Sequence, residues 1–243
     1  VIDITDEGLD KGVVPVPAGS HPAFFQRGDT SAASRILYAQ NPTVDSNARD
    51  CGGHGTNVGS IAAGYSDLTG AGDHDAEGFH YALGISPFAH LGATKIFNCA
   101  GNFDVPVPFS TLRSFSYSQG ARIANNSWGA SVGGAYNTNS QIFDGLVRDA
   151  QPGVNGNQQF AEIFSAGNSG PGVNTIGAPG TAKNVLTVGA SENVRSIGAS
   201  DGCGVPDTGA DSARDIINFS SRGPTDDGRI KPDIVAPGTH VSG

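Results

Sequence analysis

Short apolar runs separated by glycine-rich segments are the feature that most constrains the fold of this chain. Between several of these strand-like runs lie segments in which small or apolar residues repeat at helical spacing. Alternation of this kind predicts an α/β layer structure with a mainly parallel sheet. The expected strands cover 1–4, 35–38, 90–96, 122–125, 161–165, 184–188 and 233–235, and the expected helices cover 56–63, 110–119 and 140–149.

The composition is that of a globular protein and argues against two classes of partner. Of 243 residues, 36 are glycine and 14 are proline, but 37% are hydrophobic and fall in runs between the glycines, as tight turns between buried elements require. We expect a single domain over 1–243. The net charge of -9 and the lack of a Lys/Arg block argue against nucleic acid. No apolar stretch reaches the roughly 20 residues that span a bilayer, so no membrane partner is expected.

Polar motifs follow the expected strands where the chemistry of an open parallel sheet is usually found, outside the carboxyl ends. Asp6 follows the first strand, residues 126–129 and Asn168 follow two later ones, and His54 opens a helix of small residues. Each has a plainer explanation. Asp6 and Asn168 are typical turn or cap residues. The amino terminus of a helix disfavours a protonated His54, which is compatible with a role as a base but does not require it. The residues taken singly leave these alternatives open.

The order of three motifs resembles the subtilase family of serine proteases. Asp-x-Gly stands at 6–8, His-Gly-Thr at 54–56 and Ala-Gly-Asn at 166–168, and the resemblance covers the whole chain. It implies a three-layer subtilisin-like fold with a mainly parallel central sheet, here a partial catalytic domain incomplete at both ends. The absence of Met is consistent with the oxidation-resistant alkaline branch. Supporting blocks lie at 126–129, 177–185, 219–224 and 231–238.

The resemblance assigns a role in peptide-bond hydrolysis to three residues. His54 would be the base that activates a serine hydroxyl, and Asp6 would fix its tautomer and stabilise the imidazolium. Asn168 would donate its side-chain amide to the oxyanion of the tetrahedral intermediate. No cofactor is expected for this chemistry.

The resemblance also implies polypeptide substrates that pair with exposed strand edges through main-chain hydrogen bonds. The P1 side chain of the substrate would enter a cleft between residues 127–129 and residues 165–167. A second strand edge that pairs with the substrate would lie near residue 101. Trp128 could instead be a core aromatic residue. The residues concerned are Ser127, Trp128, Gly129, Ser165, Ala166, Gly167 and Gly101.

The nucleophilic serine of the family is not assigned within this sequence. Ser221 and Ser242 lack the Gly-Thr-Ser context that family members have. We therefore expect the serine beyond Gly243, in a C-terminal segment that would be this chain's own partner. The alternative is an inactive subtilase-fold fragment or pseudoprotease that binds peptides or partners without cleavage.

The family fold further implies a disulfide between Cys51 and Cys99, with Cys203 left single. Such a bridge indicates a secreted protein in an oxidising setting. The count of three cysteines does not establish it, and two free buried thiols are the alternative.

Three alternating acids, Asp73, Asp75 and Glu77, could supply oxygen ligands to a structural calcium ion. Three alternating acids in a glycine-rich loop are more often solvated charges. We assign no metal site from the sequence.

Overall fold

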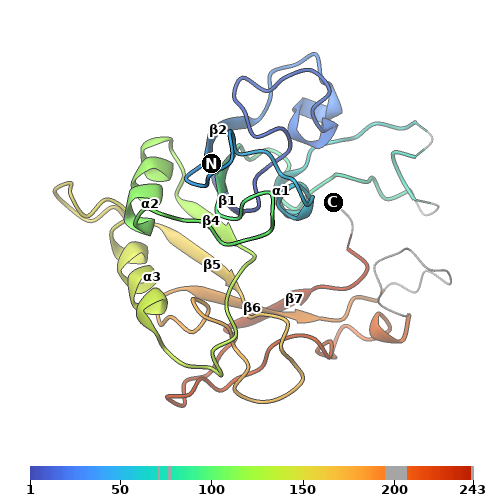
Figure 1. Ribbon diagram of the computed structural model, residues 1–243. Helices are drawn as coiled ribbons and strands as arrows, with labels where there is room; N and C mark the ends of the chain where they lie inside the picture. The colour runs from blue at the N-terminus through green and yellow to red at the C-terminus, as the bar shows by residue number, and fades with distance from the viewer. Residues whose placement is uncertain (71, 76–77, 195–206, 242–243) are drawn as a thin grey trace. The chain divides into compact units, whose positions relative to one another are not determined.

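The computed structural model describes residues 1–70, 72–75, 78–194 and 207–241. These form two compact units, each of which holds part of the α/β pattern (Figure 1). The first unit contains Val1–Asn125 and Asp149–Phe160, and the second contains Asn126–Arg148 and Ala161–Val241. A single domain over 1–243 stays a prediction.

The first unit is built on parallel strands in the order β2-β3-β1-β4. Each strand lies near its expected position, and β1 and β2 both pair with β3 in parallel, as predicted. The strands are β1 (Ile2–Asp6), β2 (Ile36–Gln40), β3 (Leu91–Lys95) and β4 (Ile123–Asn126), the last of which ends at the boundary between the units. The helices are α1 (His54–Ala63), α2 (Phe109–Ser118) and the short 3₁₀ turns η1 (Pro22–Phe24) and η2 (Gln26–Gly28).

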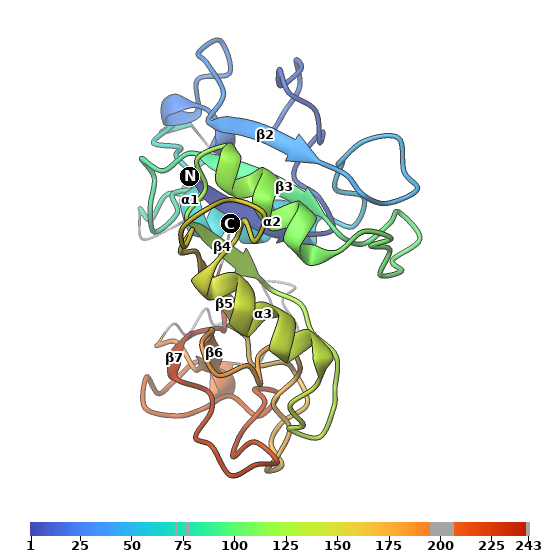
Figure 2. The same cartoon turned by 90° about the vertical axis from the view of Figure 1, so that its left-hand side faces the viewer.

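Helices cover both faces of this part of the sheet. Successive residues of a strand point to opposite faces. Ile4 of β1 faces α1, where a methyl group on Gly59 would lie 3.7 Å from Ile4 Cγ1. Asp3 faces α2 and accepts a hydrogen bond from Ser116, and Figure 2 shows α2 lying across these strands. The first unit therefore has three layers, as expected.

The α2 face of β1 buries a polar cluster. Asp3 Oδ2 accepts hydrogen bonds from Tyr38, at 2.6 Å, and from Thr94, at 2.8 Å. Burial, and then the nearby Asp3 carboxylate, raise the pKa of Tyr38, so the phenol stays protonated and can donate. Arg113 lies 3.7 Å from Asp3 Oδ1, and both side chains are fully buried. Because a buried charge is costly unless it is paired, this cluster holds α2 against the sheet.

The second unit continues the pattern with strands in the order β5-β6-β7, all parallel. Trp128 and Phe143 pack against the buried Phe164 of β5, with ring centroids 5.3 Å and 4.8 Å from that of Phe164. Aromatic pairs of this kind fix the helix that carries Phe143 on the sheet. The elements are β5 (Ala161–Ser165), β6 (Leu186–Ser191), β7 (Ile234–Pro237), α3 (Thr138–Arg148) and the 3₁₀ turn η3 (Asp207–Gly209).

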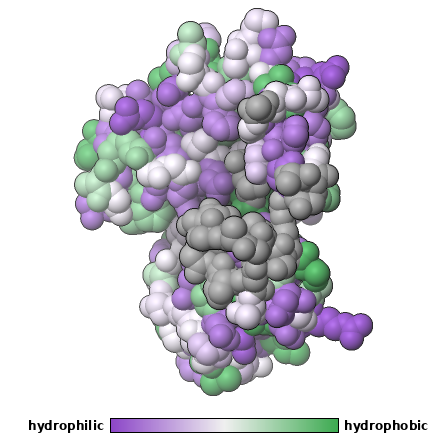
Figure 3. All heavy atoms as spheres, turned by 90° about the vertical axis from the view of Figure 1, so that its right-hand side faces the viewer, coloured by the Kyte–Doolittle hydropathy of each residue, from purple (hydrophilic) through white to green (hydrophobic). Residues whose placement is uncertain are grey.

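Apolar residues are also exposed at the surface. Hydrophobic and hydrophilic residues are interspersed on the face drawn in Figure 3, and the most exposed large apolar side chains are Ile85 and Ile230. None of the helices in the described part of the chain has the length and apolar character to span a bilayer.

We expect Asp3→Asn to destabilise the protein by about 3–5 kcal/mol, because it removes a charge partner of the fully buried Arg113. Denaturant unfolding followed by circular dichroism measures this loss. The matched control is Asp67→Asn, which breaks the solvent-exposed pair with Arg27 and should cost no more than about 1 kcal/mol. Equal losses for the two variants would contradict a structural role of the buried cluster.

Candidate active site

Asp6 and His54 meet although 48 positions separate them in the sequence. Asp6 is the last residue of β1, and His54 is the first residue of α1. The His54 ring Nδ1 lies 2.7 Å from Asp6 Oδ1. The Asp6 side chain is buried, whereas about half of the His54 side chain is exposed. The buried Asp6 carboxylate therefore contacts one nitrogen of the His54 ring, and part of the ring stays accessible to solvent.

Asp50 explains why α1 begins at His54. Its Oδ1 accepts the N–H groups of Gly52, at 3.1 Å, and Gly53, at 2.7 Å, and its Oδ2 accepts that of Thr56 at 2.7 Å. The first N–H groups of a helix have no partners within the helix, and a carboxylate there satisfies them and favours the helix dipole. Gly53 has φ +92°, a conformation that favours glycine. Asp50 was not singled out from the sequence.

Gly55 lets the start of the helix approach the acid. A Cβ atom at this position would overlap the carbonyl oxygen of Gly8 and lie 3.2 Å from Asp6 Cβ. A larger residue would push His54 away from Asp6. The glycine of His-Gly-Thr is thus required by close packing.

The surrounding charges favour a protonated His54, whereas the helix start alone was expected to disfavour it. The hydrogen bond with Asp6 raises the pKa of His54, and the negative charges of Asp6, Glu7 and Asp50 add to this effect, while burial opposes it. The pKa of His54 therefore lies above its ordinary value of 6.5. A base in this setting works only above that raised pKa.

Asn168 lies in the second unit, on the loop that follows β5. Its side chain is exposed. Ser221 forms hydrogen bonds with the residues before and after Asn168. Its N–H donates to Gly167 O at 2.8 Å, and its Oγ accepts the N–H of Ser169 at 3.0 Å. Ser221 is almost completely buried. It supports the Asn168 loop, a role that sequence reasoning missed.

A small cavity of about 160 Å³ adjoins this loop. Residues 165–168 form one side, and residues 188–190 and 236–238 line the remainder. The expected residues Ser165, Ala166, Gly167 and Asn168 therefore lie together around one space. Ser127, Trp128 and Gly129 do not line it.

Gly177 links the two segments expected to flank P1. Its N–H donates to Ala166 O at 2.9 Å, and the next residue, Ala178, exchanges two backbone hydrogen bonds with Ala130. The segments ending at Gly129 and Gly167 thus lie on either side of one strand-like stretch. Trp128 packs into the aromatic cluster of the core and is also partly exposed, so its expected role in binding stays a prediction.

Gly101 lies in the first unit, on a small hairpin. Phe97 and Phe103 form an antiparallel bridge, and Asn98 Oδ1 accepts the N–H groups of Ala100 and Asn102 at 3.1 Å each. Gly101 is exposed and has φ +78°. The structure offers an exposed turn here, while a substrate edge at Gly101 stays a prediction.

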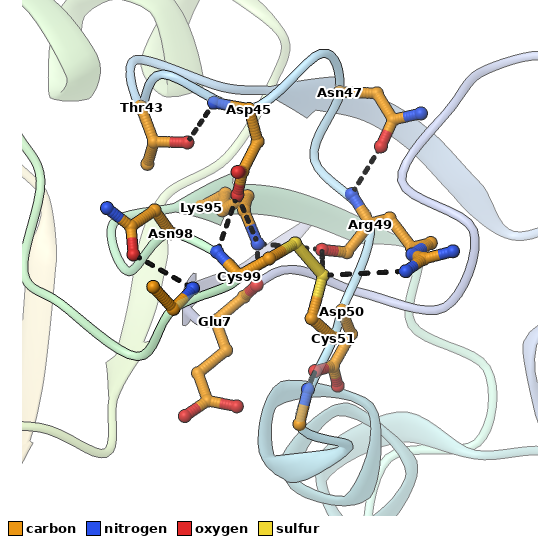
Figure 4. Close-up of a disulfide and its surroundings, with 12 residues drawn as sticks. Glu7, Thr43, Asp45, Asn47, Arg49, Asp50, Cys51, Lys95, Asn98 and Cys99 are labelled. Carbon is orange, nitrogen blue, oxygen red and sulfur yellow. Dashed lines mark hydrogen bonds and ion pairs between the residues drawn. A yellow bond between two sulfur atoms is a disulfide. The ribbon is translucent and has the colours of Figure 1, made fainter.

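A disulfide joins Cys51 to Cys99 across 48 positions, with the two Cα atoms 5.3 Å apart (Figure 4). It links the segment before His54 to the hairpin that carries Gly101. Both cysteines are exposed, unlike the buried thiols of the alternative. Cys203 lies outside the described residues.

In the loop that carries the alternating acids, backbone N–H groups donate hydrogen bonds to two of the carboxylates. Asp73 Oδ2 accepts the N–H of Gly70, and Asp75 Oδ1 accepts that of Phe79, both at 2.8 Å. Glu77 lies outside the described residues. Within the described part of the chain, no group of three or more His, Cys, Asp or Glu residues is placed to hold a metal ion. Structural calcium stays unassigned.

The subtilase family model matches residues 1–243. The chain belongs to the subtilase family. It is 30% identical to pyrolysin of Pyrococcus furiosus in an alignment of 217 positions that covers 76% of this chain and 15% of pyrolysin. It is 43% identical to the serine protease AprX of Bacillus subtilis over 77 residues, which are 32% of this chain and 15% of AprX. The chain thus matches about 15% of the length of these relatives.

Solved structures show the same fold. The CspB protease of Clostridium perfringens superposes with a TM-score of 0.61 at 13% identity, covering 99% of this chain and 76% of that one. The subtilisin-like protease Apa1 of Pseudoalteromonas sp. AS-11 gives 0.55 at 19% identity, covering 98% and 41%. The predicted α/β subtilisin-like fold is therefore confirmed.

We expect Glu7→Gln to lower the pKa of His54, because it removes one of the negative charges that raise it. Titration of the His54 ring by NMR measures the shift directly. If His54 is the base, the acidic limb of the kcat/KM profile of the complete protein moves to lower pH in parallel. Asp29→Asn, which removes an exposed charge not among the causes of the His54 shift, should leave both midpoints unchanged. An unshifted His54 in Glu7→Gln would contradict the electrostatic explanation.

Proposed function

We propose that the complete protein is a serine endopeptidase that hydrolyses peptide bonds through an Asp-His-Ser triad. The observation that carries the proposal is the 2.7 Å contact between His54 Nδ1 and Asp6 Oδ1 in a member of the subtilase family. The named relatives support it, since AprX is a serine protease. The acid, His54 and a serine would act together as one unit.

The contact suits an acid–base cycle. With Nδ1–H donated to Asp6, the other ring nitrogen of His54 is free to take the proton of a serine hydroxyl as its oxygen attacks the carbonyl carbon. The imidazolium then gives that proton to the leaving amine, and a water molecule repeats the sequence to release the acyl group. The charge of Asp6 stabilises the imidazolium between the two transfers.

The nucleophile is proposed to lie beyond Gly243. Ser221 is a poor candidate because it is buried and its Oγ already accepts a backbone hydrogen bond from Ser169. Ser242 lies outside the described residues. The segment carrying the serine would be the partner of this chain.

Asn168 is proposed as an oxyanion donor, and polypeptides as the substrates. The exposed amide lies on a loop fixed by Ser221, and preorganised donors are the ones that stabilise developing charge. The segments 127–129 and 165–167 would flank the P1 side chain, and Gly101 would pair with the substrate backbone.

An exposed disulfide supports a secreted, extracellular protein, because such bridges persist in oxidising surroundings. The catalytic chemistry proposed here requires no cofactor. A structural calcium ion remains a separate and unassigned hypothesis.

We expect the complete protein to digest casein at neutral to alkaline pH and to lose this activity on treatment with a serine-directed phosphonyl reagent. Mass spectrometry of the treated protein should locate the label on one serine in a peptide beyond Gly243. Inhibition by metal chelators together with insensitivity to the reagent would refute the proposal. Casein binding without cleavage would instead support the pseudoprotease alternative.

We expect Asn168→Ala in the complete protein to lower kcat by about 10²–10³-fold with little change in KM, a magnitude taken from a subtilisin, a relative of this chain. The amide would meet the oxygen only after it becomes negative, so ground-state binding is little affected. Steady-state kinetics with a peptide anilide give the two constants. A raised KM with unchanged kcat would show that Asn168 binds substrate instead.

A further inference from the structure

Lys95, the last residue of β3, is fully buried and contacts two loops, the one that follows Asp6 (residues 7–12) and the one that precedes His54 (residues 48–53). Its Nζ donates to Glu7 O at 2.6 Å and to Arg49 O at 2.7 Å. Glu7 directly follows Asp6, and Arg49 lies five residues before His54. A single ammonium group thus bonds to the backbone next to the acid and to the segment that leads to the base.

The same two loops are also joined directly. Leu9 N–H donates to Ala48 O at 3.2 Å, and Asp50 N–H donates to Asp10 O at 3.1 Å. Arg49, which accepts a hydrogen bond from Lys95, lies between Ala48 and Asp50 in the sequence, so the Lys95 contacts add to these backbone bonds. In the β1–β3 register Lys95 is the direct partner of Asp6, so its position is fixed by strand pairing.

Asp45 supplies the negative charge that balances Lys95. Its Oδ2 lies 3.4 Å from Lys95 Nζ and also accepts the N–H of Cys99 at 2.8 Å (Figure 4). A buried ammonium is tolerated only when it is paired and hydrogen-bonded. The disulfide from Cys51 to Cys99 joins the segment of Arg49 to the residue whose N–H donates to Asp45.

We propose that Lys95 is a positioning residue that sets the geometry of the acid–base pair by holding the Glu7 and Arg49 carbonyl groups together. This inference rests on the proposed function of Asp6 and His54. Lys95 does not act on substrate, and its effect passes through the backbone of the two loops.

Loss of the ammonium group leaves the Glu7 and Arg49 carbonyl groups without this donor. The loops then relax, and the ring of His54 is no longer held in line with Asp6. A reacting group displaced by about 1 Å costs on the order of 10²-fold in rate. A weaker hydrogen bond between Asp6 and His54 also reduces the main cause of the raised His54 pKa.

The test compares Lys95→Met with Lys231→Met in the complete protein. Lys231 is an equally suitable buried lysine of the second unit: its Nζ donates to Val185 O at 2.9 Å and contacts Asp233 Oδ2 at 2.6 Å. Both variants remove a buried ammonium, so both lower the unfolding midpoint. Kinetics are referred to active sites counted by labelling with the phosphonyl reagent, so that unfolded molecules do not contribute.

We expect Lys95→Met to lower kcat by about 10–100-fold with KM nearly unchanged and to lower the pKa of His54 in an NMR titration. Lys231→Met should retain the wild-type kcat and the wild-type His54 pKa. If Lys95→Met does not fold, Asp45→Asn decides, since it should shift kcat and the His54 pKa in the same direction to a smaller extent.

Equal kcat values for the two lysine variants, or an unchanged His54 pKa in Lys95→Met and Asp45→Asn, would overturn the positioning role. A wild-type protein that does not react with the phosphonyl reagent would instead overturn the proposed function. The NMR titration still tests the position of His54 in that case, so the two failures are distinguishable.

Discussion

The pairing of β1 with β3 is the interaction on which the positions of Asp6 and Lys95 depend. It places Asp6 and Lys95 side by side at the carboxyl ends of two parallel strands. Parallel pairing needs both faces of the sheet covered, and α1 and α2 provide this cover. The strand end then presents an acid to the helix start and an ammonium group to the loops. The backbone hydrogen bonds that pair β1 with β3 therefore stabilise the sheet and also position Asp6 and Lys95.

Much of this arrangement could be predicted from the sequence. All seven expected strands and three expected helices are present in the described residues, within a few positions of their expected bounds. Periodicity revealed them because buried strands read as short apolar runs and helices as repeats of small residues. Asp6 and His54 were predicted as partners through the order of motifs, since spacing over 48 residues carries no geometric information by itself.

The supporting residues were not predictable in the same way. Lys95 lies in a buried strand, and only the charge between Thr94 and Ile96 could have indicated it. Asp50 looks like any turn residue until its three N–H donors are seen. The sequence excluded Ser221 as the nucleophile but did not indicate that its hydroxyl accepts a hydrogen bond from the loop that carries Asn168. Such roles depend on contacts across the fold, which no local pattern encodes.

The contacts described between the segments of Asp6 and His54 come from residues 6–99, from the end of β1 through the hairpin at Cys99. During synthesis the amino-terminal part of a protein leaves the ribosome first and can fold early. The charge pair can therefore assemble while residue 168 is still being added. Under the roles proposed for His54 and Asn168, a polypeptide made in this order would carry its proton acceptor before its donor to the oxyanion, so the Asp6–His54 pair alone would give a nascent chain no complete means of attacking its own backbone.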